Sequence, residues 1–332
     1  MRNFRTIVDI TESEHKISHQ TGLVFMGSCF SESIGQKLVD YKIPVDLNPF
    51  GVLYNPASIA ESLDILISKK IFTEDDLHFA NERWFSFYHH SDFSHQDKNT
   101  CLELINSRIH TSHGFLKNAG YLFITLGTSW VFSLASTGKV VSNCHKIPPR
   151  EFIRQRLCVD EITKLLKKSL DELRQFNPNI KIVFTISPIR HWKDGAHGNQ
   201  VSKAGLLLAV EKLVEETKQL AYFPSYEIMM DDLRDYRFYE SDMLHISPLA
   251  VDYIFDAFAG SYFSSATKNL NQEIEKIVKA TKHKAFNPKS KSYIGFLESN
   301  IETIEKLETK NPNLNFNLEK NYFISEKKIV KL

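Results

Sequence analysis

Apolar runs of strand length alternate along the chain with longer segments in which apolar residues recur at helical spacing. The runs cover residues 23–26, 121–126, 181–186 and 226–230. This alternation is typical of a parallel sheet that is covered by helices. The sequence therefore predicts an α/β fold.

Helix signals fall between these runs. Pro56 suits a first helical position, where its missing N–H costs nothing, and Ser247 with Pro248 forms a good cap and first-turn pair. We expect Asp160 to cap another helix, which ends at 177–179. Further helices are expected over 31–41, 56–68, 102–116, 201–220 and 248–263.

Other segments interrupt this alternation. Residues 131–141 predict a hairpin that adds a small antiparallel piece to the sheet, and 84–88 predict a further strand. The segments 44–55 and 187–199 are predicted to be loops.

The composition changes after residue 264. Residues 261–332 contain 13 Lys and 8 Glu, a net charge of +5, and have few strand-like runs. We expect two domains, an α/β catalytic domain over 1–264 and a helical extension over 265–332. A solvated extension that packs on the core or on another subunit is favoured over a dedicated binding tail.

The overall charge is balanced, with 41 Lys and Arg against 40 Asp and Glu. A formal charge of +1 provides no field that would recruit nucleic acid or an anionic membrane. No stretch approaches the roughly 20 apolar residues that cross a bilayer, and the first residues lack an apolar signal core. We expect a cytoplasmic protein with a small-molecule partner, while the oligomeric state is left open.

The sequence provides no argument for a metal or a cofactor. The four cysteines are far apart and form no Cys-x-x-Cys pair, and the histidines of 89–95 fit no standard zinc spacing. Glycine-rich nucleotide motifs and Walker sequences are absent. We therefore expect neither a metal site nor a nucleotide cofactor.

Ligands of open α/β sheets bind at the carboxyl ends of the strands, where Ser28 follows the first predicted strand. A serine between a strand and a helix can direct its own N–H, and the helix dipole, at a developing oxyanion. Asp242 and His245 are three residues apart just before a predicted helix, so the carboxylate can orient the imidazole that activates the serine. By itself, this spacing is more often a solvated turn.

Three other features are candidates for the same site. Cys29 adjoins the serine, but we expect its thiol to turn toward the core if Ser28 faces the cleft. Arg190 and His191 follow another strand and suit a carboxylate, a phosphate or a sugar hydroxyl, whereas Asp194 has an equally good explanation as a loop tie. His145 either reaches the same cleft or is exposed.

Several ordered motifs within residues 1–265 resemble the GSCFA family, which is related to the SGNH hydrolases and PC-esterases. The motifs are "FMGSCFSESIGQKL", "NPFGVLYNP", "ITLGTSWVF", "NCHK", "SPIRHWKDGAHGNQVSKA" and "DMLHISPLA". The resemblance implies a three-layer α/β/α, flavodoxin-like fold of the SGNH type. It also implies that Ser28 is the nucleophile, with Asp242 orienting His245 as base and later as acid.

The resemblance extends to the oxyanion hole, with one departure. Gly51 is similar in place to the glycine that donates a backbone N–H, and Gly127 begins the block that commonly continues with an asparagine. Here Thr128 and Ser129 follow instead, so the usual amide donor is absent. A hydroxyl of either residue, or the amide of Asn55, is a candidate replacement.

These residues predict an esterase or deacylase that acts on a small ester or an acylated carbohydrate through an acyl-enzyme at Ser28. An O-acyltransferase with the same triad is the close alternative, because the acyl group can also pass to an acceptor other than water. A carbohydrate- or ligand-binding protein on a degenerate hydrolase fold is the alternative from another class.

Overall fold

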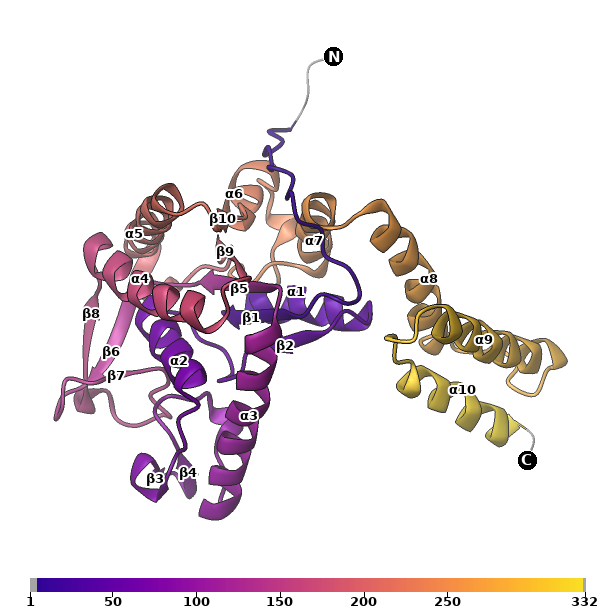
Figure 1. Ribbon diagram of the computed structural model, residues 1–332, viewed down its shortest axis with the longest axis horizontal. Coiled ribbons are helices and arrows are strands. Elements are labelled where there is room, and N and C mark those ends of the chain that lie inside the picture. Colours follow the sequence, from indigo (N-terminus) through magenta and orange to yellow (C-terminus); the bar gives the residue numbers. More distant parts are fainter. Residues whose placement is uncertain (1–4, 331–332) are drawn as a thin grey trace. The chain divides into compact units, whose positions relative to one another are not determined.

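Figure 1 shows the computed structural model of the protein, which describes residues 5–330. The chain divides into two compact units. Within the described residues, the first unit consists of 5–11, 22–35 and 45–258, and the second of 12–21, 36–44 and 259–330. Among residues 5–330, no helix is both long and apolar enough to cross a membrane.

The first unit is built on a five-stranded parallel sheet with the order β10-β9-β5-β1-β2. Numbered along the chain, this order is 2-1-3-4-5, which is the flavodoxin-like arrangement. The predicted α/β fold with a parallel sheet is confirmed. The strands are β1 (Leu23–Gly27), β2 (Val45–Leu47), β5 (Tyr121–Leu126), β9 (Lys181–Ile186) and β10 (Leu220–Tyr222).

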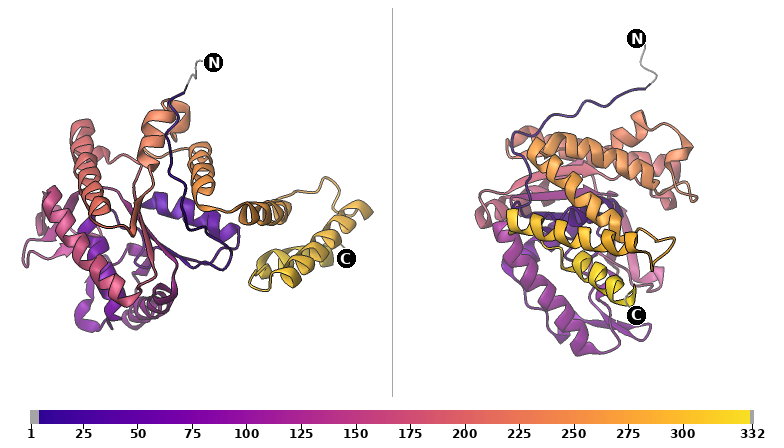
Figure 2. Two further views of the ribbon diagram at one scale, coloured as in Figure 1. Left: turned by 45° about the horizontal axis from the view of Figure 1, so that its top comes forward. Right: turned by 90° about the vertical axis from the view of Figure 1, so that its right-hand side faces the viewer.

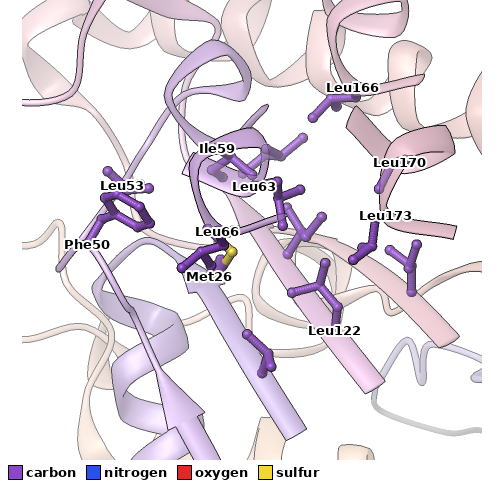
Figure 3. Packing of buried hydrophobic residues seen from close by; sticks show 14 of the residues in the cluster. Met26, Phe50, Leu53, Ile59, Leu63, Leu66, Leu122, Leu166, Leu170 and Leu173 are labelled. Atoms are coloured by element: carbon purple, nitrogen blue, oxygen red, sulfur yellow. The ribbon is translucent and has the colours of Figure 1, made fainter. Parts of the chain in front are cut away.

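Helices cover both faces of this sheet (Figures 1 and 2). Alternate residues of a strand point to opposite faces, so Met26 and Leu122 pack against α2 and α4, as Figure 3 shows. On the other face, Phe25 and Phe123 meet side chains of α1 and α7. The helices concerned are α1 (Cys29–Asp40), α2 (Pro56–Ser68), α3 (Lys98–Asn118), α4 (Val159–Phe176), α5 (Gly195–Glu216) and α7 (Pro248–Tyr262).

Two predicted strand assignments need correction. The segment 226–230 is not a strand, because it lies in the helical turns α6 (Ser225–Glu227) and Ile228–Asp232, and β10 precedes it. A short buried apolar run satisfies either structure, so its periodicity alone does not decide. The strand β2 lies inside the segment that was predicted as a loop.

The predicted hairpin is present as β6 (Trp130–Leu134) and β7 (Val140–Val141). It does not extend the main sheet, however, but forms a separate antiparallel sheet with β8 (Phe152–Arg156). The predicted strand near 84 is β4 (Arg83–Phe85), which pairs with β3 (His78–Ala80).

The predicted starts of α3, α4 and α5 were also misplaced, and α3 begins at Lys98 rather than at residue 102. The cap of α4 is Cys158 rather than Asp160, because Glu161 accepts the Cys158 N–H at 2.6 Å. The helix α5 begins at Gly195 and ends at Glu216, so it includes residues that were predicted as loop.

The second unit contains the helices α8 (Ser265–Thr281), α9 (Lys291–Lys310) and α10 (Asn317–Val330). Ile274, Leu297 and Phe323, one from each helix, are fully buried in its own apolar cluster. Lys42 and Glu319 form an ion pair of 2.6 Å in this unit. The predicted helical character is confirmed, whereas the boundary at residue 264 stays a prediction.

Candidate active site

Ser28 lies in a tight turn between β1 and the first residue of α1. The preceding Gly27 has a φ of +147°, and a Cβ at this position would lie 2.3 Å from the carbonyl oxygen of Thr125. Only glycine fits such a turn. The turn places Ser28 at the amino end of α1, where the strand order reverses between β1 and β5.

A cavity of about 470 Å³ opens at this turn. Ser28 and His245 both line it, although 216 residues separate them in the sequence. The Ser28 side chain is buried, and its Oγ has no hydrogen-bond partner among the residues that the structure describes. Of the other predicted site residues, those in the wall of the cavity are Asn55, Thr128, Arg190, His191 and Asp194.

Asp242 holds His245 through several bonds. Nδ1 of His245 lies 2.5 Å from Oδ2 of Asp242, and the other carboxylate oxygen accepts the N–H groups of Leu244 and His245 at 2.9 Å. The hydrogen bond from His245, helped by these two N–H groups, lowers the pKa of Asp242 to about 2. Since a carboxylate only accepts, Nδ1 carries the hydrogen and Nε2 is left to take a proton.

A second histidine–aspartate pair lies at the same cavity. Nδ1 of His90 is 2.9 Å from Oδ2 of Asp92, and the His90 ring also lines the cavity. This contact lacks hydrogen-bond geometry, because the same Nδ1 has no hydrogen-bond partner among residues 5–330. His90 is therefore a competitor to His245 for the role of base, with a less well-oriented ring.

The backbone donors expected around the oxyanion are engaged elsewhere. Gly51 N–H donates to the Asn48 carbonyl at 2.8 Å, and the N–H groups of Gly127 and Thr128 both donate to the Tyr54 carbonyl at 2.7 and 2.9 Å. Ser129 is fully buried, and its N–H and its hydroxyl both bond Ser202 Oγ. Gly51, Gly127 and Ser129 are thus not oxyanion donors in this conformation.

Among the predicted oxyanion donors, the N–H of Ser28 and the amide of Asn55 are less fully engaged, and the Thr128 hydroxyl lies 3.1 Å from Ser202 Oγ. Ser28 N–H makes only a long bond of 3.4 Å to Thr125 O. Asn55 caps α2 through Oδ1, and one hydrogen of its Nδ2 goes to Ser58 Oγ at 3.0 Å. An amide nitrogen has two hydrogens, so Asn55 keeps one for the cavity that it lines.

The polar loop after β9 lines the cavity and also contacts the three-stranded sheet of β6, β7 and β8. Asp194 forms an ion pair with Arg154 of β8, whose guanidinium lies 4.1 Å from the centre of the Trp130 ring. Asp194 therefore has the structural role of a loop tie in addition to its place in the cavity wall. His145 is not in that wall, because its ring stacks on Phe85 and bonds the carbonyl of Ser86.

Cys29 is not packed entirely into the core as expected. Cys29 is half-buried and lines the cavity beside Ser28. Burial, with a smaller contribution from the Glu32 carboxylate, nevertheless raises the pKa of this thiol. A protonated thiol is a poor nucleophile, so Cys29 lacks the lowered pKa that is typical of a catalytic cysteine.

Sequence reasoning missed Lys203 on α5. Its side chain is buried, and Nζ donates to the carbonyl of Ser187 at 2.6 Å. Burial, with Arg190 nearby, lowers the pKa of Lys203 to about 7. The sequence contained a signal for the burial of Lys203, because this residue shares a helical face with Leu206 and Val210.

The fold and the cavity define a flavodoxin-like α/β protein with a serine at the switch point of its sheet. The family model described as "GSCFA family" matches residues 22–258, and "GSCFA domain protein, C-terminal domain" matches 274–328. The chain belongs to the GSCFA family. The family assignment drawn from the motifs is thereby confirmed.

Solved structures resemble the chain distantly. A carbohydrate esterase family 3 protein from Talaromyces cellulolyticus matches with a TM-score of 0.38 and 8% identity over 77% of this chain and 99% of that one. The Clostridium thermocellum family 3 carbohydrate esterase matches with a TM-score of 0.35 and 10% identity over 76% of this chain and 97% of that one. The acetyl xylan esterase Est2A from Butyrivibrio proteoclasticus matches with a TM-score of 0.35 and 12% identity over 77% of this chain and 66% of that one. Comparison with curated proteins gives no match.

Proposed function

We propose that the chain is a serine esterase or deacylase of the SGNH type, acting on a small ester or an acylated carbohydrate. One observation supports this most directly. The unpartnered hydroxyl of Ser28 shares a cavity with His245, whose ring Asp242 orients. Its expected location in the cytoplasm stays a prediction from the sequence.

In the proposed reaction, Ser28 Oγ attacks the ester carbonyl carbon while Nε2 of His245 takes the hydroxyl proton. The bond to the leaving alcohol then breaks, and His245 returns the proton to the departing oxygen. Water, deprotonated by His245, attacks the acyl-enzyme. The bond between the acyl carbon and Ser28 Oγ then breaks, the carboxylic acid leaves, and His245 returns the proton to Oγ. Ser28 N–H, Asn55 Nδ2 and the amino end of α1 supply the stabilisation of the oxyanion.

Transfer of the acyl group to an acceptor hydroxyl is the second candidate function. It needs room beside His245 for a molecule larger than water. A second and larger cavity of about 680 Å³ supports this candidate, because Leu244, next to His245 in the chain, lines both cavities. Product analysis with and without added alcohols separates transfer from hydrolysis.

A fluorophosphonate probe tests the nucleophile. We expect one adduct at Ser28 in the mass spectrum of the digested protein, no adduct in Ser28→Ala, and labelling about 100-fold slower in His245→Ala. The matched controls are Ser142→Ala and His90→Ala, a serine and a histidine of the same cavity. Both should label at the unaltered rate.

Each unexpected result has a definite meaning. Absence of any label on the folded protein would favour the binding-protein alternative. A loss of labelling in His90→Ala, with His245→Ala unaffected, would move the role of base to His90. Inactivation by iodoacetamide at Cys29 would move the nucleophile to the thiol.

A further inference from the structure

The larger of the two cavities, about 680 Å³, does not contain Ser28. It is of a size that binds small molecules. Arg190 and Leu244 line both cavities, and Asp242 lines the larger one while His245 lines the smaller. The two cavities are therefore neighbours at the segment that holds the proposed base.

The wall of the larger cavity is mainly apolar. Met229, Met230 and Leu233 form part of it, and methionines adapt to irregular apolar ligands. Two of its aromatic side chains are unusually exposed, Trp192 at 53% and Tyr236 at 78%. A ligand with an apolar body would cover these rings and remove their surface from water.

The charges of this cavity are balanced except at its junction with the smaller one. Arg234 pairs with Asp231, Asp235 with Arg237 and Asp242 with His245. Arg190 has no acidic partner within residues 5–330, and its guanidinium donates to the Met230 sulfur at 3.3 Å. A second cation, Lys203, is close enough to interact with it.

We propose that the larger cavity binds the apolar body of an anionic amphiphile whose carboxylate or phosphate pairs with Arg190. A guanidinium binds both groups through paired N–H bonds, and a half-buried one without an acidic partner favours an anion. The anionic group then lies at the junction, next to the ester that Ser28 would attack. The claim that this ligand is a substrate rests on the proposed function. The claim that the ligand binds does not.

Calorimetric titration of the Ser28→Ala protein tests the binding without turnover. The probes are octanoate and octyl phosphate, with 1-octanol as the neutral counterpart and acetate as the headless anion. We expect at least one anionic amphiphile to bind 10-fold or more tightly than 1-octanol, and acetate to bind at least 10-fold more weakly than octanoate. The comparison of octanoate with octyl phosphate identifies the preferred anion.

Two variants in this background assign the contacts. Arg190→Gln should abolish the 10-fold preference for the anion and leave 1-octanol binding unaltered, which also shows that the protein is folded. Tyr236→Ser should weaken the amphiphile and 1-octanol together. Arg150→Gln is the matched control, since Arg150 is 83% exposed and paired with Glu151, and it should change nothing.

The outcomes separate this inference from the proposed function. Equal binding of 1-octanol and both anions, or a preference that survives in Arg190→Gln, would overturn the inference. If the fluorophosphonate labels Ser28 but no amphiphile binds, the inference alone fails. If the amphiphile binds through Arg190 and no label forms, the cavity assignment stands and the esterase proposal fails.

Discussion

Around Ser28, the polar side chains differ in how many of their hydrogen-bonding atoms are already in use. The N–H and the hydroxyl of Ser129 both bond Ser202 Oγ. Asn55 Nδ2, in contrast, donates one of its two hydrogens to Ser58 Oγ. A donor that is already engaged must break a bond before it can reach an oxyanion, and that bond offsets the gain. At the residue scale, we therefore propose Asn55 as the replacement for the missing asparagine of the family pattern.

Asn55→Asp separates the two roles of this residue. Aspartate caps a helix as well as asparagine does, so the cap is kept, and burial of the carboxylate should lower the free energy of unfolding by about 1–3 kcal/mol. The amide donor is lost, so kcat of the proposed esterase should fall about 100-fold. Urea unfolding and steady-state kinetics measure the two effects.

The companion variant Asn55→Ala loses the cap as well and should be destabilised by about 1 kcal/mol. Unaltered turnover in Asn55→Asp would show that this amide does not stabilise the oxyanion.

Among the elements, the connection from β1 to α1 allows no variation in its backbone. Gly27 N–H donates to Asn48 Oδ1 at 3.0 Å, and the next helical turn begins with Ser31 N–H on the Ser28 carbonyl at 2.8 Å. Because both sides of the turn are bonded, the position of Ser28 depends on the conformation that Gly27 permits.

Gly27→Ala should therefore destabilise the protein by at least about 3 kcal/mol, since the new methyl group would overlap Thr125 O. Gly138→Ala is the matched control, because Gly138 also has a positive φ, +71°, but nothing lies within 4 Å of the added carbon. It should cost only about 1 kcal/mol. Equal losses in urea unfolding would show that crowding at Thr125 is unimportant.

For the molecule as a whole, buried histidines connect stability to pH. Burial lowers the pKa of His89 to about 3 and those of His145 and His191 to about 4. Unfolded histidines have pKa values of about 6.5, so below that pH the unfolded chain binds more protons than the folded one. The free energy of unfolding is therefore unaffected by these histidines above a pH of about 6.5. It decreases as the pH falls toward 4.

His89→Phe tests this dependence at one site, where the imidazole lies among the rings of Phe50, Phe72 and Phe93. Relative to the parent protein, the variant should gain about 2 kcal/mol in unfolding free energy between pH 8 and pH 5. The difference between two pH values cancels any constant packing cost. His110→Phe, at an exposed position of α3, is the control and should show no such gain.

Much of the sheet was predictable because β1, β5 and β9 are buried almost throughout, which leaves a continuous apolar run in the sequence. The strand β10 was misplaced because three residues form too short a pattern. In the second unit, the lysine-rich composition indicated helices correctly. Periodicity along one segment, however, contains no information on which other segment pairs with it.

The position of Ser28 after an apolar run was enough to nominate it, because parallel strands bring their carboxyl ends to one edge. Asp242 and His245 were nominated by their spacing before a capped helix, although the strand expected at 226–230 is helical. Folding determined which of the remaining donors are free. The Tyr54 carbonyl engages Gly127 and Thr128 from a point more than 70 residues away in the sequence, and Ser202 engages Ser129 from a similar separation. Hydrogen bonds of such range depend on three-dimensional proximity, which local sequence patterns do not encode.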